Sequence, residues 1–296
     1  GWTGGTFNNG LFEPPAVWYN GIANGGIFSG ITWWSGLVRN AAFYNGFFHG
    51  GVFNNGTMNK TVIDGGTFNG GNFNNNGTIY AYYSPIIFYG GRLSGGTLNG
   101  SSPSLSDPEV RGTELFGTKV IEANIYKTKA TLVDFQGGKI YGGEFFKCSV
   151  ENGVDIYNGT FYDLSVYTGE YGNPFNIHNG TFFYSTFVNP KTVVYNGNFT
   201  RCISHDIIWN YGVYSDGKMY GGTWNDGYWN DGYMTGVTWN DGHFYGGWFW
   251  CVPPASGFFK GGTFHYGYLN GVYYTQLPRN KTFYTQTATN NTNYSQ

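Results

Sequence analysis

Residues 64–77 read DGGTFNGGNFNNNG, and this stretch contains a spacing that neither a helix nor a lone strand explains. Phe68 and Phe73 are five residues apart, and a glycine stands two positions before each of them. A helix returns to the same face about every 3.6 residues and a strand about every 2. A large side chain at every fifth residue therefore predicts a chain that turns after each short, straight segment.

The spacing of five continues through most of the chain, in two long blocks. In the first block an apolar residue recurs at Trp18, Ala23, Phe28, Trp33, Val38, Phe43, Phe48, Phe53, Met58, Ile63, Phe68 and Phe73. In the second block, from Val194 to Tyr274, it recurs at Phe199, Met219, Trp224, Trp229, Met234, Trp239, Phe244, Phe249, Phe259, Phe264 and Leu269. We infer that the large residue fills an interior, that the small residue two before it leaves room on the same inner face, and that the residue between them points outward.

These features predict an all-β protein, a β-solenoid built of five-residue sides. If four sides close one coil, the solenoid is quadrilateral and residues about twenty apart lie above one another, at the spacing of neighbouring strands. A meandering antiparallel sheet of hairpins, as in MORN-type repeats, is the alternative, because WNDGYWNDG at 224–232 is also typical of turns.

The repeat resembles the pentapeptide-repeat family, whose unit has Leu or Phe at its centre and a small residue two before it. The resemblance covers most of the chain and implies a right-handed quadrilateral β-helix. The family prefers Ala at the small site, whereas Gly66-Thr67-Phe68 and Gly227-Tyr228-Trp229 are typical here, so the chain resembles a divergent relative. Its glycine-aromatic units are also similar to those of phage tail and surface fibre proteins.

The pattern suggests four segments. Residues 1–100 form the first part of the solenoid and residues 135–275 the second. Residues 101–134, rich in charge and with two prolines, are expected to be a non-repeat insertion, either a functional protrusion or a solvated connection. Residues 276–296 form a polar tail or cap, and the start at Gly1 without methionine suggests a piece of a longer or processed polypeptide.

Composition narrows the classes of partner. Charged residues make up 11% of the chain and the formal net charge is -2, so there is no basic field to attract nucleic acid. No run of eighteen apolar residues is present, so membrane insertion is not expected. Cys148, Cys202 and Cys251 are too scattered for a disulfide framework or a zinc site.

The residue types that carry catalysis are scarce and scattered. Asp216, Asp226, Asp231 and Asp241 fall at expected corners, where Asn-Asp-Gly is ordinary turn chemistry, although catalysis or calcium binding remains an alternative. The five histidines have no ligand spacing. Cys148 and Cys202 occupy the small inward site, which favours a packing role over a redox role. We therefore expect no enzyme activity, no metal and no cofactor.

The outward positions carry the candidate binding residues. A twenty-residue coil would place Tyr228, Trp248 and Tyr268 in one exposed column, with Tyr245 above Asn225 and below His265. Such aromatic side chains could stack on sugars, face another subunit or stack on one another.

The sequence thus suggests a self-associating structural rod or fibre segment of a virion, such as a phage tail, or of an extracellular surface. The alternative is an adhesin or receptor-binding protein that binds cell-surface glycan through exposed Tyr and Trp. A glycan-cleaving tailspike is a third class, which would need clustered carboxylates.

Overall fold

In the computed structural model the chain is a β-solenoid in which each strand pairs in parallel with a strand of the next rung, as β1 does with β4. The structure describes residues 1–275 except 60, 64, 75–77, 81–85, 90–91, 95–96, 100–108, 152, 168–172, 189 and 251–257. Among these described residues there is no helix. Two units can be distinguished, Gly1–Ser165 and Val166–Gln296, and they are called the N-terminal and C-terminal units below.

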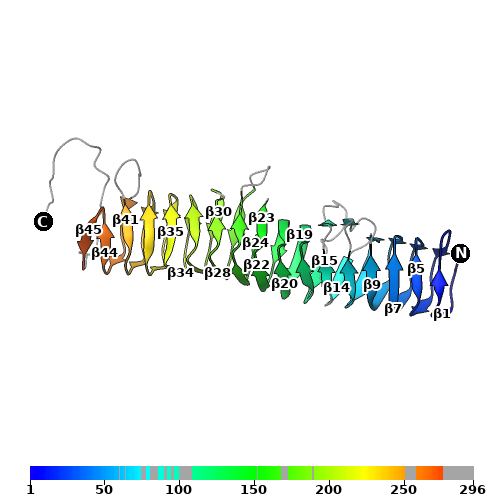
Figure 1. The fold of residues 1–296 in the computed structure, drawn as a ribbon. Helices are drawn as coiled ribbons and strands as arrows, with labels where there is room; N and C mark the ends of the chain where they lie inside the picture. Colours follow the sequence, from blue (N-terminus) through cyan, green and yellow to red (C-terminus); the bar gives the residue numbers. More distant parts are fainter. Residues whose placement is uncertain are drawn as a thin grey trace. The chain divides into compact units, whose positions relative to one another are not determined.

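The strand pairings divide the strands of the N-terminal unit into three stacks, and Figure 1 shows the rungs of this unit following one another along the coil. The first contains β1 (Thr6–Asn8), β4 (Ile22–Asn24), β11 (Gly66–Asn69), β14 (Ile86–Tyr89), β17 (Glu109–Arg111) and β24 (Asp155–Ile156). The second contains β2 (Leu11–Phe12), β5 (Ile27–Ser29), β12 (Asn72–Asn74), β15 (Arg92–Ser94), β18 (Glu114–Phe116), β20 (Thr128–Thr131), β22 (Gly143–Phe146) and β25 (Thr160–Tyr162). The third contains β3 (Val17–Trp18), β6 (Thr32–Trp33), β8 (Phe47–Phe48), β10 (Val62–Ile63), β13 (Thr78–Tyr80), β16 (Thr97–Asn99) and β23 (Ser149–Glu151).

Four longer strands of this unit run round a corner. β7 (Leu37–Tyr44) and β9 (Val52–Asn59) belong to both the first and the second stack. β19 (Lys119–Tyr126) and β21 (Asp134–Ile140) belong to both the third and the first. β26 (Ser165–Val166) contains the last residue of the N-terminal unit and the first of the C-terminal unit.

The C-terminal unit also has three stacks. The first contains β27 (Phe175–Ile177), β30 (Thr192–Val194), β33 (Ile208–Trp209), β36 (Thr223–Trp224), β39 (Thr238–Trp239) and β42 (Phe258–Phe259). The second contains β28 (Thr181–Phe183), β31 (Asn198–Thr200), β34 (Val213–Ser215), β37 (Tyr228–Trp229), β40 (His243–Phe244) and β43 (Thr263–Phe264). The third contains β29 (Thr186–Phe187), β32 (Ile203–His205), β35 (Gly217–Tyr220), β38 (Gly232–Thr235), β41 (Trp248–Trp250), β44 (Gly267–Leu269) and β45 (Val272–Tyr274).

The strand register corrects the predicted size of the coil. Val38 pairs with Phe53 and Phe53 pairs with Phe68, so stacked residues are about 15 apart, and the coil has three sides. The quadrilateral coil of about twenty residues was therefore wrong. Where residues 20 apart do stack, as Phe244 and Phe264 do, the rung holds additional residues between its strands. The antiparallel meander was also wrong, because the rungs pair in parallel. Among the strand pairs whose residue register is known, β44 with β45 is the antiparallel one.

The inward positions follow the predicted spacing of five. All the residues of the first block, from Trp18 to Phe73, are buried, with at most 1% of each side chain exposed. Inward rings also stack along the coil: in the second block Trp209, Trp224 and Trp239 lie nearly parallel, with centroids 5.0 and 4.9 Å apart. Stacked aromatic rings of this kind bury a large apolar area in the core. The indole N–H groups of these tryptophans have no hydrogen-bond partner, which is a cost of filling a narrow coil with tryptophan.

Most of the predicted insertion belongs to the solenoid. Residues 109–134 form β17 to β20 and begin β21, and the residues Val110, Leu115, Val120, Ile125 and Ala130 are buried at intervals of five. Threonine takes the place of glycine at the small inward site, so the sequence pattern was hidden. The hydroxyl of Thr128, for example, donates to the Val110 carbonyl at 3.4 Å. The rest of that segment, residues 101–108, and the predicted tail 276–296 lie outside the described residues.

The glycine at the small inward site is required by the backbone as well as by the space. Gly227 has φ 116°, and a Cβ there would stand 2.5 Å from the Gly212 carbonyl oxygen and 3.3 Å from Trp209 Nε1. Gly71 has φ 96°, and its Cβ would stand 3.0 Å from the Gly56 oxygen. Residues other than glycine rarely adopt such φ values.

We therefore expect Gly71→Val and Gly227→Val each to lower the free energy of unfolding by about 1–3 kcal/mol, through backbone strain and overpacking. Thr67→Val places the same side chain on the outer face and should change stability by less than about 0.5 kcal/mol. Urea unfolding of the three variants measures the difference. Equal losses at the inner and outer sites would contradict the register.

Candidate aromatic surface

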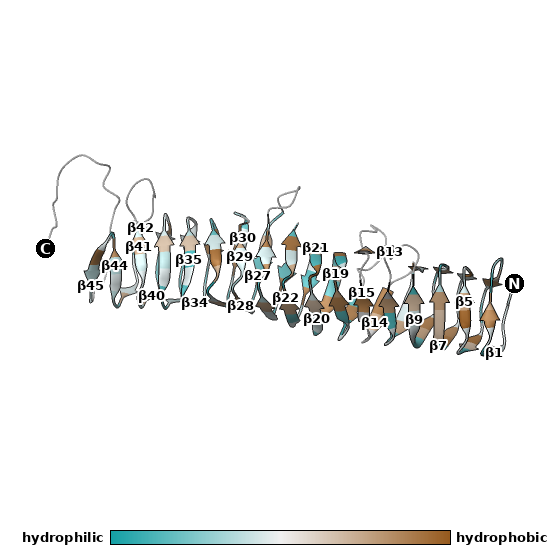
Figure 2. Ribbon diagram, viewed as in Figure 1, coloured by the Kyte–Doolittle hydropathy of each residue, from teal (hydrophilic) through white to brown (hydrophobic). Residues whose placement is uncertain are grey.

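Exposed aromatic rings gather on the last described rungs of the C-terminal unit. In the second stack Tyr228 lies on β37, and Tyr245 and His265 directly follow β40 and β43; in the third stack Trp248 lies on β41 and Tyr268 on β44. Trp248 is exposed, and the other four are half-buried. The ribbon around β40 and β41 is largely pale in Figure 2, because Tyr, Trp and Gly lie near the middle of the hydropathy scale. This surface contains all four of the aromatic residues predicted from the sequence.

Trp248 and Tyr268 stack as predicted. Their ring centroids are 3.9 Å apart with an interplanar angle of 5°, and the two residues pair across β41 and β44. They are twenty residues apart because this rung is longer than the usual 15, so the prediction was right for a reason that it did not contain. Trp248 keeps 41% of its surface exposed.

Tyr228 does not lie in that column. It pairs with His243 in the second stack, and the two rings stack with centroids 5.2 Å apart. The residue that pairs with Trp248 on the preceding rung is Tyr233. The predicted column of three was wrong because a coil of 15 residues moves Tyr228 to another face.

Tyr245 stacks on His265, as expected, with centroids 4.0 Å apart and an interplanar angle of 7°. Its predicted neighbour on the preceding rung was wrong. Trp229 pairs with Phe244, which places Asn230 rather than Asn225 beside Tyr245. Asn225 belongs to an amide ladder in the first stack, where Asn240 donates to Asn225 at 2.7 Å and Asn225 donates to Asn210 at 2.8 Å.

Two histidines meet on this surface, which the sequence analysis missed. His243 Nδ1 lies 3.3 Å from His265 Nε2, and the tautomers decide which nitrogen donates. Both side chains are half-buried. Burial and the neighbouring His243 lower the pKa of His265. Because the two residues are 22 apart, only the register of the longer rung could have indicated the pair.

The aspartates act at corners, as the turn interpretation expects. The backbone N–H of Gly227 donates to Asp226 Oδ1 at 2.6 Å, and Gly232 and Gly242 donate in the same way to Asp231 and Asp241 at 2.7 Å. Asp216 instead pairs with Arg201, with a distance of 2.8 Å between Oδ2 and Nε. Within the described part of the chain, no three His, Cys, Asp or Glu side chains are grouped to hold a metal ion.

The two described cysteines occupy core positions. Cys148 and Cys202 are buried and free, and Cys202 Sγ donates to the Phe182 carbonyl at 3.4 Å. Burial raises the pKa of the Cys148 thiol to about 11 and that of Cys202 to about 12. The thiolate, which is the reactive form, is therefore disfavoured at both.

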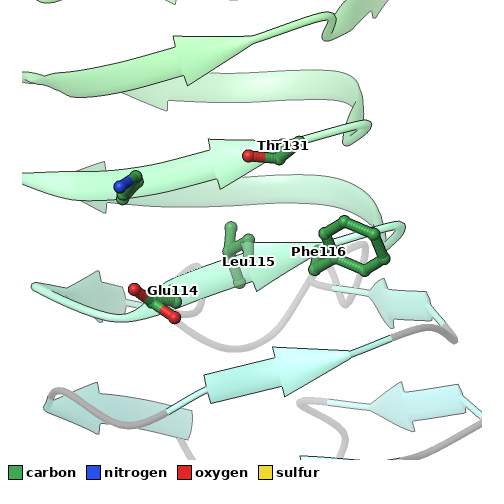
Figure 3. Close-up of a pocket in the computed structure, with 5 residues that line it drawn as sticks. Glu114, Leu115, Phe116 and Thr131 are labelled. Atoms are coloured by element: carbon green, nitrogen blue, oxygen red, sulfur yellow. The ribbon is translucent and has the colours of Figure 1, made fainter.

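The N-terminal unit carries its own outward features. Tyr126, Tyr141 and Tyr157 stack with centroids 4.6 and 4.9 Å apart, and the Arg111 guanidinium lies 4.1 Å from the Tyr126 centroid. A shallow depression on the second stack is lined by Glu114, Leu115 and Phe116 of β18 and by Lys129 and Thr131 of β20 (Figure 3). These side chains spread along two flat strands and do not converge on one point, so the depression offers no enclosed site.

Comparisons with family models, with curated proteins and with solved structures found no match to this chain. The resemblance to pentapeptide repeats therefore rests on the five-residue spacing and on the small residue two positions before each large one. Among the described residues, no helix is long and apolar enough to cross a membrane.

The lowered pKa of His265 makes a prediction about stability. The unfolded chain takes up a proton at this residue near pH 6.5, before the folded chain does, so the free energy of unfolding should fall as pH is lowered through that value. Urea unfolding at about pH 7.5 and about pH 5.5 measures the loss. We expect His265→Gln to reduce the loss and His178→Gln, a histidine elsewhere in the unit, to leave it unchanged. The same pH dependence in His265→Gln and the wild type would contradict this.

Proposed function

We propose that the chain is a structural segment of a rod or fibre in a virion, such as a phage tail, or in a cell-surface assembly, and that copies of it self-associate. The observation that carries the proposal is that outward side chains of one rung contact the same type of side chain on the next rung. Asparagines form such a ladder at Asn210, Asn225 and Asn240, and tyrosines form one at Tyr126, Tyr141 and Tyr157. Side chains used in this way reinforce a coil along its length.

The positions of the carboxylates support a structural role over catalysis. A glycosidase needs two carboxyl groups facing each other across a substrate, at about 5–10 Å. Asp226, Asp231 and Asp241 each accept a hydrogen bond from the next backbone N–H at a corner. Carboxylates held in corner turns contribute to the shape of the coil.

The exposed aromatic surface supports self-association. Trp248, Tyr266 and Tyr273 are each more than 40% exposed, and they lie on neighbouring segments at the C-terminal rungs. Aromatic residues are enriched where proteins contact one another. The formal net charge of -2 supplies little repulsion between copies.

Glycan binding is the second candidate, and the Trp248–Tyr268 pair favours it. Sugars stack on exposed aromatic rings, and Trp248 is the exposed member of this pair. One face of each ring is covered by the other ring, which leaves less stacking surface than a lone tryptophan would offer. We therefore place this candidate second.

Two finer points of the fold belong to the proposal. A right-handed coil is proposed because crossovers between parallel strands are right-handed in nearly all proteins. Kinship with the pentapeptide repeats is proposed from the buried residues at intervals of five and the small residue two before each.

Sedimentation velocity of the 296-residue chain at micromolar concentration tests the function. We expect the wild type to form oligomers, and Trp248→Asp and Tyr268→Asp to shift it toward monomer by at least about tenfold in dissociation constant, because each places a charge in an apolar contact.

Tyr195→Asp is the matched control, since Tyr195 is an exposed tyrosine of the same unit that stacks on His178. It should leave the oligomer unchanged. A wild type that stays monomeric, together with loss of binding to a glycan array in Trp248→Asp, would overturn the structural proposal in favour of glycan binding.

A further inference from the structure

The histidine pair on the aromatic surface has the geometry of a metal-binding site. His243 begins β40, and His265 directly follows β43, the strand that pairs with β40 on the next rung. The backbone N–H of His265 donates to the Phe244 carbonyl at 2.7 Å, so the positions of the two residues are set by the ladder. Their facing ring nitrogens, Nδ1 of His243 and Nε2 of His265, are 3.3 Å apart.

That distance is the one that a tetrahedral metal ion requires. Zinc binds imidazole nitrogen at about 2.0–2.1 Å, so two nitrogens at the tetrahedral angle are about 3.3–3.4 Å apart. Imidazole is a preferred ligand of Zn²⁺, Cu²⁺ and Ni²⁺. The two nitrogens therefore already stand at the separation of two ligands of one ion.

The surroundings hold the rings in place. Tyr228 stacks on His243 and Tyr245 stacks on His265, both with interplanar angles of 7°. Groups that fix the orientation of ligating histidines contribute strongly to metal affinity. The imidazole must be neutral to bind a metal.

We propose that His243 and His265 bind one divalent transition metal ion, Zn²⁺, Ni²⁺ or Cu²⁺, which joins the rung of β43 to the rung of β40. Nδ1 of His243 and Nε2 of His265 each give a lone pair to the ion. Each neutral ring then carries its proton on the other nitrogen, Nε2 of His243 and Nδ1 of His265. Without the metal, one of the two facing nitrogens carries the proton of the hydrogen bond between the rings, and metal binding moves that proton to the other nitrogen of the same ring, so no proton is released. Water fills the remaining coordination positions.

The ion would hold β43 against β40 at the last described rung of the second stack. Among the described strands β43 pairs with β40 alone, so it has one neighbour where the inner strands of its stack have two. A strand with one neighbour opens more readily than one inside the ladder. A ligand that binds only the closed rung stabilises it by mass action.

Titration calorimetry of the intact chain with ZnCl₂, NiCl₂ or CuCl₂ tests the site. We expect about one ion per chain for at least one metal, and His243→Gln and His265→Gln each to weaken its affinity by at least about tenfold. His178→Gln and His205→Gln are matched controls, since each removes a histidine that stacks on a tyrosine, and they should leave the affinity unchanged.

Hydrogen exchange gives a second readout that does not depend on the affinity alone. Adding the metal should slow hydrogen exchange at the backbone amides of Thr263 and His265 in the wild type and should not change it at residues 263 and 265 of the His265→Gln variant. Far-ultraviolet circular dichroism checks that both proteins are folded. No binding of any of the three ions up to about 1 mM would overturn the proposal. An affinity that falls equally in His178→Gln and in His265→Gln would overturn it too.

Discussion

The rest of the structure depends on the close approach of successive rungs at the small inward site, where in places one glycine stands over another. In the C-terminal unit Gly227 stands over Gly212, Gly242 over Gly227 and Gly262 over Gly242, and a Cβ on the upper residue of each pair would strike the backbone of the lower. Gly36, Gly51 and Gly66 repeat the arrangement above Gly21 in the N-terminal unit. At these positions the rungs stack so closely that only a residue without a side chain fits, whereas Thr113 and Thr128 fill the same site in the rungs of residues 109–134.

Ladders of like side chains follow from that spacing. Once backbones stack at strand distance, the side chains above one another are also at strand distance, inside and outside the coil. Planar groups suit such a spacing, because rings and amides can lie flat on one another. Trp209, Trp224 and Trp239 do so in the core, and Asn210, Asn225 and Asn240 do so on the surface. The abundance of aromatic residues and asparagine is thus explained by the same constraint as the abundance of glycine.

The sequence predicted which residues point inward, because that depends only on distance along the chain. Trp18 to Phe73 were placed correctly at every fifth position. The number of sides could not be predicted in this way, since five-residue sides fit both a triangle and a square. It depends on how sharply each corner turns, and corner residues such as Asn45 and Asp206 take φ values of 52° and 53° that residue spacing alone does not specify. Neighbours across rungs depend on that number, so Tyr228 was assigned to the wrong column and His243 was not connected to His265.

The antiparallel strand β45 makes the two ends of the third stack different. Parallel rungs propagate because each new strand presents the same pattern of donors and acceptors as the strand beneath it. β45 reverses this pattern on the third stack, where Leu269 pairs with Val272 and Gly267 with Tyr274. A further parallel rung cannot be templated on β44, whose outer edge is occupied. Parallel addition of rungs therefore stops at β45 in the third stack. A strand that pairs beyond it must match the free edge of β45, whose direction is opposite to that of the other strands of the stack.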